Sequence, residues 1–352
     1  MEDYLGRVDG KSSRFRALVL RQNKIATRYY ALDREGNATY SNAEMAARAI
    51  EAATAHAGIA LPQLGFLATA TTLGDVLLPG LASHTHAELG IDPIEVASFQ
   101  SVCASALMAL KNGYLQVKVG EHDHAAVCGS EFCSRYFRPG FYEGTDPVAE
   151  EGRVPLGADF LRFTLSDGAG AMILGPVPIT GRPSFRICWI DLRSYANQFE
   201  TSMIAGGTRS NGTTRYWGDF ESPAAAAQAG ALMLTQDFDL MKAMLPVWNS
   251  HFVDLVGSGK IVVDEIDHLC SHYSSHSLRV EAMRLMKASG CEIEEEKWFS
   301  NLYTKGNTGA ASIFIMLEEF ARSRSLHPGE KVLCHVPESG RSMNGFMLLE
   351  VV

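Results

Sequence analysis

The sequence IEVASFQSVCASALMALKNGYLQVKV, residues 94–119, is the stretch from which the organisation of the chain is inferred. Its first part, residues 94–102, is an apolar run of the kind that forms a strand. The small residues after Cys103 begin a second part, in which apolar side chains recur near helical spacing. The pattern therefore predicts a strand, a turn at Cys103 and then a helix.

At such a turn, Cys103 faces the free backbone N–H groups at the start of the helix. These dipoles favour a thiolate over a thiol, and we expect them to lower the pKa of Cys103. The small neighbours allow the carbonyl of a substrate to approach the sulfur. A buried structural cysteine is the alternative interpretation, because free cysteines are among the most buried residues in proteins.

The composition restricts the classes of function. The 352 residues suffice for two domains or one large layered unit, and the net charge of −9 disfavours a general nucleic-acid binder. No apolar stretch approaches the ~20 residues of a membrane span, and the N-terminus has no apolar signal region. The seven cysteines are an odd number without paired spacing, which favours the reducing cytoplasm over a disulfide framework. No metal-binding motif appears, so no metal site is predicted.

Strand and helix patterns alternate along the chain and then alternate again. The predicted helices cover residues 41–60, 76–89, 278–288 and 313–321, with a longer helical region over residues 224–255. The predicted strands cover residues 64–72, 94–102, 124–131, 163–176, 185–196, 266–272, 331–338 and 345–352. Residues 132–160 are expected to form a long loop. This alternation predicts a layered α/β protein made of two similar units, which we divide into residues 1–180 and 181–352.

Five motifs, in this order, resemble those of the thiolase superfamily and, within it, of the β-ketoacyl-acyl-carrier-protein synthase III-like enzymes. They are SVCASALMAL (101–110), GSE (129–131), SDGAGAMIL (166–174), SHYSSHSLR (271–279) and KGNTGAASI (305–313). The resemblance extends over residues 17–352 and implies a thiolase-like fold. Two similar βαβαβαββ halves then pack as a layered α-β-α-β-α body, the first carrying the nucleophile and the second a histidine and an asparagine.

The resemblance implies that Cys103, His272 and Asn307 are the catalytic residues. Cys103 takes the acyl group as a thioester, which divides one difficult acyl transfer into two easier steps. His272 and Asn307 direct N–H donors at the oxygen of the second substrate, where negative charge develops. A satisfied buried histidine and a turn asparagine are the alternatives for the last two residues. His276 is the alternative candidate for the histidine.

The chain departs from the family's pattern at two places. Four strands are predicted before Gly175, where the family has five, so either the numbering begins inside the natural protein or residues 1–16 replace the missing strand. The family's C-terminal glycine loop appears as PESGRSMNG, residues 337–345. Gly340 is the expected oxyanion-hole donor there, beside the backbone N–H of Cys103. This form of the loop resembles a divergent, secondary-metabolism branch of the family.

The resemblance also implies particular carriers and an assembly. Substrates are expected to arrive as thioesters of acyl carrier protein or CoA, with no cofactor. No tryptophan occurs in residues 17–28, where the housekeeping enzyme stacks the CoA adenine, and this favours the carrier protein. Arg279 is the expected carrier-binding residue, and Lys305 lies near the Asn307 turn. A homodimer is expected in which residues 94–102 pair across the axis and Leu78 reaches into the partner's acyl channel.

Three functions remain open from the sequence. The leading one is a condensing acyltransferase of fatty-acid or polyketide biosynthesis, in which the acyl group on Cys103 undergoes decarboxylative Claisen condensation with a malonyl- or β-ketoacyl-thioester. The second is an acyltransferase that forms an ester or an amide. The third is a non-catalytic subunit of a heterodimeric synthase. The presence of Cys103, His272 and Asn307 together favours condensation.

Overall fold

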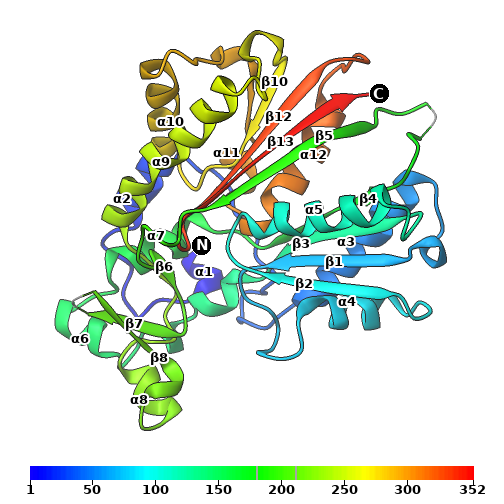
Figure 1. Ribbon diagram of the computed structural model, residues 1–352. Coiled ribbons are helices and arrows are strands. Elements are labelled where there is room, and N and C mark those ends of the chain that lie inside the picture. The colour runs from blue at the N-terminus through cyan, green and yellow to red at the C-terminus, as the bar shows by residue number, and fades with distance from the viewer. Residues whose placement is uncertain (180, 211) are drawn as a thin grey trace.

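The computed structural model describes residues 1–179, 181–210 and 212–352, and it shows two sheets separated and flanked by helices (Figure 1). Two helices lie between the sheets, α5 (Ser105–Lys118) and α12 (Ser312–Ser323). The N-terminal sheet is covered on its outer face by α3 (Asn42–Ala57) and α4 (Leu81–Leu89), and the C-terminal sheet by α9 (Phe238–Gly257) and α10 (His276–Ala288). The layers follow the order α-β-α-β-α, which confirms the predicted thiolase-like fold.

The N-terminal sheet has the strand order β2-β1-β3-β4. Its strands are β1 (Phe66–Thr71), β2 (Glu95–Gln100), β3 (Ala125–Glu131) and β4 (Gly168–Leu174). β1 runs parallel to both of its neighbours, whereas β4 runs antiparallel to β3. Parallel strands of this kind place their carboxyl ends at one edge of the sheet, so the segment that leads to Cys103 and the end of β3 meet there.

The C-terminal sheet has the order β11-β10-β12-β13-β5. Its strands are β5 (Phe185–Ser194), β10 (His268–Ser271), β11 (Trp298–Phe299), β12 (Lys331–Glu338) and β13 (Met343–Val351). β5 pairs with β13, whereas the corresponding edge of β4 carries no strand among the described residues. The four predicted strands before Gly175 are therefore confirmed.

The first residues of the chain do not supply the missing strand. They form α1 (Glu2–Leu5), and an isolated bridge pairs Val8 with Lys11. The predicted boundary after residue 180 falls on Thr180, which lies outside the described residues. The strands of each sheet come from one side of that boundary, and the division into two domains stays a prediction.

Local sequence explains several element boundaries. Ser41 begins α3 with a capping box, because its hydroxyl accepts the N–H of Glu44 while the Glu44 carboxylate accepts the N–H of Ser41. The helix expected over residues 76–89 begins only at Leu81, because Pro79 and Gly80 disfavour helix at its start. Residues 73–80 are a loop instead, and this loop exposes Leu77 and Leu78.

Two regional predictions were wrong in detail. The loop expected over residues 132–160 contains α6 (Asp146–Glu151) and the start of α7 (Leu156–Thr164), whose residues from Ala158 onward are buried. The helical region expected over residues 224–255 is interrupted, since α8 (Pro223–Gln228) and the short strand β9 (Thr235–Gln236) precede α9. The apolar periodicity of the sequence does not reveal the turn at residues 229–234, where Gly230 has a φ of 76° and the helix is interrupted.

The remaining elements form a lobe and the site's supporting turns. The lobe contains α8 with the strands β6 (Met203–Ile204), β7 (Gly207–Ser210) and β8 (Thr213–Tyr216). The others are α2 (Arg16–Asn23) and α11 (Leu302–Lys305). The central core packs α5 and α12 against both sheets. No helix within the described ranges is long and apolar enough to cross a membrane.

Candidate active site

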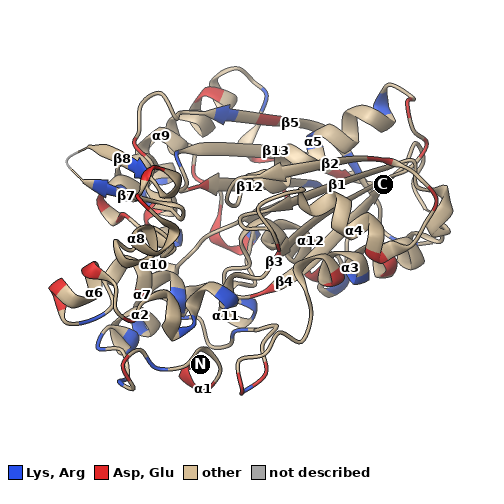
Figure 2. Ribbon diagram, turned by 90° about the horizontal axis from the view of Figure 1, so that it is seen from below, with Lys and Arg blue, Asp and Glu red and all other residues tan. Residues whose placement is uncertain are grey.

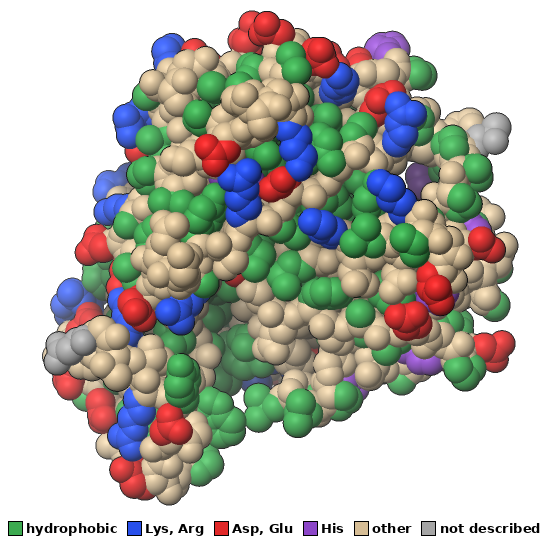
Figure 3. All heavy atoms as spheres, in the orientation of Figure 1, with side chains coloured by type: hydrophobic (Ala, Val, Ile, Leu, Met, Phe, Trp, Pro, Cys, Tyr) green, Lys and Arg blue, Asp and Glu red, His purple; other side chains and the backbone are tan. Residues whose placement is uncertain are grey.

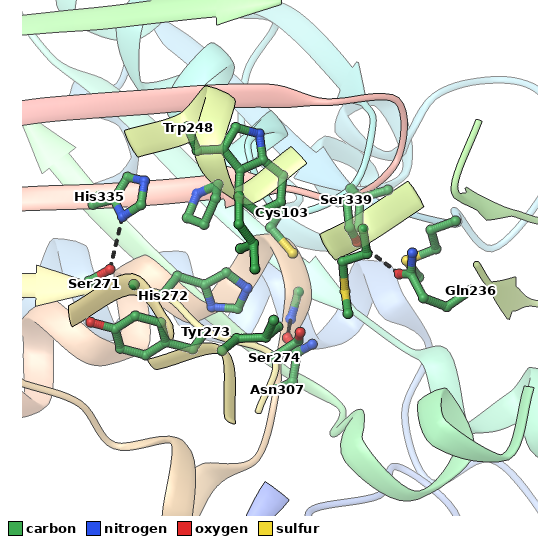
Figure 4. A pocket seen from close by; sticks show the side chains of 18 of the residues that line it. Cys103, Gln236, Trp248, Ser271, His272, Tyr273, Ser274, Asn307, His335 and Ser339 are labelled. Carbon is green, nitrogen blue, oxygen red and sulfur yellow. Dashed lines mark hydrogen bonds between the residues drawn. The ribbon is translucent and has the colours of Figure 1, made fainter. Parts of the chain in front are cut away.

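A single pocket brings together the three residues that the motifs single out (Figure 4). Cys103, His272 and Asn307 all line it, and it holds roughly 1050 Å³ of empty space, part of which is open to solvent. Figure 3 shows a hollow with hydrophobic side chains between the lobe of β7, β8 and α8 and the N-terminal sheet. The predicted site residues therefore meet, although they lie on opposite halves of the chain.

Cys103 lies just before α5, in the turn that follows β2. Its side chain is 6% exposed, and residues 104–107 are fully buried. The Ser105 hydroxyl donates a hydrogen bond of 2.6 Å to the Val102 carbonyl, which fixes the turn. Small buried side chains allow α5 to begin close to the sheet, and Cys103 lines the pocket.

The electrostatic environment of Cys103 differs from the prediction. Burial raises the pKa of the Cys103 thiol well above its ordinary value, and the carboxylates of Glu338 and Glu131 raise it further. The first N–H at the helix start does not face the sulfur, because Ala104 donates it to Glu338 at 3.1 Å. Glu338 also accepts the hydroxyl of Ser101 at 2.6 Å. The expectation of a lowered pKa was therefore wrong, and the free protein holds Cys103 as a thiol.

His272 directly follows β10 and is held by its backbone, which donates a hydrogen bond of 2.9 Å to the carbonyl of His335. The residue is 4% exposed. Burial lowers the pKa of His272 to about 4, so the imidazole is neutral near pH 7. A neutral imidazole donates a hydrogen bond without first losing a proton.

Asn307 is fixed on both sides by backbone contacts. Its N–H donates to the carbonyl of Thr164 at 3.0 Å, and its carbonyl accepts from Ser166 at 2.8 Å. The side-chain oxygen of Asn307 accepts the N–H of Gly309 at 3.0 Å. Since the oxygen is engaged, the amide NH₂ remains as the donor for a substrate. Figure 4 shows Asn307, His272 and Cys103 around one space.

Glu131 anchors the turn that carries Asn307, and no role was predicted for this residue of the GSE motif. Its carboxylate accepts N–H groups from Ala310 at 3.0 Å and from Thr72 at 3.1 Å. Burial raises the pKa of Glu131 to about 7. Gly309 lies directly against this carboxylate with a φ of 51°, and a Cβ there would lie 2.6 Å from an oxygen of Glu131. The turn is therefore tolerant only of glycine at this position.

Comparisons with known proteins agree with this geometry. The family described as 3-oxoacyl-(acyl-carrier-protein) synthase III, C terminal, matches residues 258–349. Beta-ketoacyl-(acyl-carrier-protein) synthase III of Rhodospirillum rubrum is 23% identical over 326 residues, which cover 92% of this chain and 87% of the relative. These similarities indicate the synthase III-like branch of the thiolase superfamily. This confirms the family predicted from the motifs, and synthase III-like enzymes are acyltransferases of the condensing type.

Two further similarities extend over most of the chain. Acetoacetyl CoA synthase NphT7 of Streptomyces sp. (strain CL190) is 27% identical over 319 residues, covering 90% of this chain and 84% of the relative. The solved structure titled AbyA1, tetronic acid condensing enzyme, has a TM-score of 0.75 at 22% identity. That similarity covers 98% of this chain and 94% of AbyA1, so the synthase III-like fold extends over the described chain.

Behind the three catalytic candidates of this synthase III-like chain lies a buried polar network that the sequence analysis missed. The Ser271 hydroxyl contacts His335 at 3.0 Å, and His335 contacts the amide oxygen of Asn344 at 2.8 Å. Asn344 continues to His251 at 3.3 Å, and His251 contacts the carboxylate of Asp191 at 3.0 Å. Ser271 directly precedes His272, so this network fixes the strand end from which the imidazole projects. His251 and His335 are far apart in the sequence, so no local motif indicates this network.

The other predicted site residues of the synthase III-like pattern do not line the pocket. Gly340 is in the turn after β12, where Ser339 lines the pocket instead and the Gly340 carbonyl accepts the N–H of Ser202 at 2.7 Å. Leu78 is 85% exposed on the loop after β1. Arg279, on α10, pairs with Glu295 at 2.9 Å. The roles assigned to Gly340, Leu78 and Arg279 therefore stay predictions.

His276, the alternative histidine, is at the start of α10. Its ring contacts the hydroxyl of Tyr303 at 2.8 Å. It does not line the pocket, whereas His272 does. The geometry therefore favours His272 over His276 as the donor to a substrate.

Proposed function

We propose that this synthase III-like enzyme loads an acyl group onto Cys103 and then condenses it with a malonyl-type thioester. The observation that carries the proposal is the convergence of Cys103, His272 and Asn307 on one apolar pocket. His272 has a depressed pKa and is neutral, and Asn307 keeps its NH₂ free for a ligand. Two uncharged donors facing a thiol suit a reaction that builds negative charge on an oxygen.

In the loading step, the sulfur of Cys103 attacks the carbonyl carbon of an acyl thioester. A C–S bond to Cys103 forms, the bond to the carrier sulfur breaks, and the carrier thiol leaves with the proton given up by Cys103. Because the pKa of Cys103 is raised, this proton must be removed during the reaction rather than before it. The backbone N–H groups of Cys103 and Gly340 are the expected donors to the carbonyl oxygen.

In the condensation step, the carbon–carbon bond to the carboxylate of the malonyl group breaks and CO₂ leaves. The electron pair forms an enolate, whose oxygen is held by His272 and Asn307. The enolate carbon then attacks the acyl carbon on Cys103, the C–S bond breaks, and the released thiolate takes up a proton. A β-ketoacyl thioester is the other expected second substrate.

An acyl carrier protein is the carrier we expect, and a positive patch beside α10 supports this. Burial and then the charges of Lys24 and Arg279 lower the pKa of His276, which places both cations around the start of α10. In Figure 2, Lys and Arg segments lie along α2 and α11 in the same region. Arg279 pairs with Glu295, and the side chains are 14% and 62% exposed, so an acidic carrier helix would compete with Glu295 from the solvent side.

The exposed apolar side chains of the N-terminal half support a homodimer. Leu77 and Leu78 are 79% and 85% exposed, and Val96 on the edge strand β2 is 37% exposed. An uncovered strand edge and exposed leucines are unfavourable in a monomer. We expect β2 to pair across a twofold axis, with Leu78 entering the partner's pocket. Sedimentation at micromolar protein that gives a stable 38.3 kDa monomer would contradict this assembly.

The proposed steps use thioester substrates and call for no cofactor. No group of metal-ligating side chains that could hold an ion occurs within the described ranges. All seven cysteines are free thiols, which supports the cytoplasm as the expected compartment.

Release of labelled CO₂ from a malonyl donor tests the function. His272→Ala and Asn307→Ala are expected to acquire the acyl mass on Cys103 but to release CO₂ about 100- to 1000-fold more slowly, because each lacks one enolate donor. Simple acyl transfer predicts that Asn307 matters little, since His272 would act as a general base on an alcohol or amine. A wild-type enzyme that releases no CO₂ yet acylates such an acceptor would overturn the proposal.

A further inference from the structure

The pocket continues beyond the catalytic residues into the outer layer of the C-terminal half. Behind His272 it extends between α9, α10 and the outer face of the C-terminal sheet. We call this part the inner cavity and define it by Leu245, Trp248, Phe252, Leu278, Ala282 and Leu285. These side chains are apolar, and the first three lie on α9 while the others lie on α10.

The walls of the inner cavity are held in place by contacts outside it. The indole N–H of Trp248 donates to the Ser342 hydroxyl at 3.1 Å. The rings of Tyr273 and Trp298 stack with centroids 6.0 Å apart, and the indole of Trp298 donates to the Ile293 carbonyl at 2.9 Å. These contacts hold the aromatic side chains in place. The walls therefore cannot move inward to fill the space, as loosely held core side chains would.

A polar atom in the wall supports the same view. Tyr273 lines the pocket and is 5% exposed, yet its hydroxyl has no hydrogen-bond partner among the described residues. Buried hydroxyl groups in closed cores are normally hydrogen-bonded. The hydroxyl itself is shielded from solvent, so the surroundings of Tyr273 differ from those of a closed core in leaving a polar atom unpaired.

We propose that the inner cavity receives the alkyl chain of the acyl group on Cys103, so that the donor is a medium-length or long linear acyl thioester. This inference rests on the proposed loading of Cys103. The sulfur and the inner cavity belong to one continuous pocket, whose surface is mostly apolar. A straight chain gains from each methylene that it buries there, by about fourfold in binding per methylene.

The inner cavity and the Leu78 loop predict different residues as the limit on the length of the acyl chain. Leu78 is 85% exposed and limits the chain only if a second subunit brings it to the sulfur. The inner cavity is formed within one chain, and Ala282 is the small residue of its α10 wall. Enlarging Ala282 therefore shortens the space for a chain without altering any residue near Leu78.

The test measures loading of Cys103 by N-acetylcysteamine thioesters from acetyl to dodecanoyl, followed by intact-protein mass spectrometry. Wild type is expected to load decanoyl groups faster than acetyl groups. Ala282→Phe is expected to lose decanoyl loading by about 50-fold, if three methylenes are displaced, and to keep acetyl loading. Retained acetyl loading shows that the variant is folded. Leu285→Ala, which enlarges the cavity, is expected to move the preference to longer chains.

Val280→Phe is the matched control, because Val280 is on the same helix but 51% exposed, and it should leave all rates unchanged. Equal decanoyl loading by Ala282→Phe and wild type would overturn the inference. So would a loss of decanoyl loading in Leu78→Trp that Ala282→Phe does not share. In both cases acetyl loading and CO₂ release would continue, so the proposed function would stand. Failure of every donor to acylate Cys103 would remove the function and the inference together.

Discussion

The two halves of the molecule repeat one order of strands and helices, except that the described N-terminal half has no counterpart of β5, and they fill the layer outside the sheet differently. In the N-terminal half, α3 places Ala46 and Ile50 directly on the sheet, and both are 0% exposed. In the C-terminal half, α9 and α10 carry larger side chains and enclose the inner cavity. The comparison teaches that one half is packed to hold a nucleophile rigidly, while the other makes room for a substrate.

The chemistry on the two sides of the pocket differs as well. Cys103 is surrounded by the buried carboxylates of Glu131 and Glu338. His272 is neutral through burial alone, and Asn307 is uncharged. Negative charge lies on the nucleophile's side, and uncharged donors lie on the opposite side. Substitutions on either side of the pocket test this division, and the nucleophile is expected to show the largest effect.

Loss of the nucleophile should have the largest effect. Cys103→Ala is expected to carry no acyl mass after incubation with donor thioesters, because the variant lacks the thiol that would form the thioester beside His272 and Asn307. Intact-protein mass spectrometry with tryptic mapping makes the measurement. Cys133→Ala is the control, since Cys133 is also buried and lines the pocket. An acyl group on Cys103→Ala, or its loss from Cys133→Ala, would place the nucleophile elsewhere.

The contact between the halves at Gly309 should have the next largest effect. Gly309→Ala places a Cβ 2.6 Å from the Glu131 carboxylate at a φ of 51°, so the Asn307 turn must shift. Because one enolate donor is displaced, CO₂ release should fall about 100-fold while acyl loading persists. Gly257→Ala is the control, since a Cβ there meets nothing within 4 Å. Unchanged CO₂ release in Gly309→Ala would show that the turn is free to adjust.

The raised pKa of Cys103 gives a pH prediction. Alkylation of Cys103 by iodoacetamide should be slow near neutral pH and should rise about tenfold per pH unit from about pH 7 to about pH 9, because only the thiolate reacts. Glu338→Gln removes a charge that raises this pKa, so alkylation at a given pH should be several-fold faster. Burial, the larger cause, remains in the variant.

Mass spectrometry of the Cys103 peptide measures the rate of alkylation. The glutamine keeps an acceptor for the N–H of Ala104, so the helix start is preserved. Identical rates in Glu338→Gln and wild type would mean that Glu338 is already neutral in the free enzyme. The division of charge between the two sides of the pocket would then be weaker than described.

The smallest effect is expected at the surface of the C-terminal half. Arg279→Glu should raise the Michaelis constant for an acyl carrier protein substrate several-fold and spare an N-acetylcysteamine thioester, because the small donor makes no contact with the surface. Arg284→Glu on the same helix is the control, since its charge is paired with Glu281 in solvent. Equal effects of Arg279→Glu on both donors would assign a structural role to Arg279.

Much of the fold was predictable because its local signals are strong. The Ser41 capping box, the apolar strand before Cys103 and the glycine-rich turn after Lys305 all mark their elements correctly. The three candidate catalytic residues were predictable because Cys103, His272 and Asn307 each lie in a motif that resembles one of the family. Such motifs reflect a local backbone shape as well as a side chain.

The parts that were missed depend on contacts between distant segments. Glu338 meets the first N–H of α5 only through folding, so the helix start could not reveal that the pKa of Cys103 is raised. The chain from Ser271 through His335 and Asn344 crosses three strands of the C-terminal sheet. The inner cavity is a space between two amphipathic helices. The apolar face of a helix has the same periodicity whether it packs against other side chains or lines a cavity.

The inner cavity also has a mechanical consequence. Hydrostatic pressure favours states of smaller volume, and unfolding eliminates internal voids. The layer of α9 and α10 is therefore the part of the molecule expected to yield first as pressure rises, while the closely packed layer of α3 persists. An alkyl chain that fills the void would oppose this yielding, so the occupied enzyme should withstand higher pressure than the empty one.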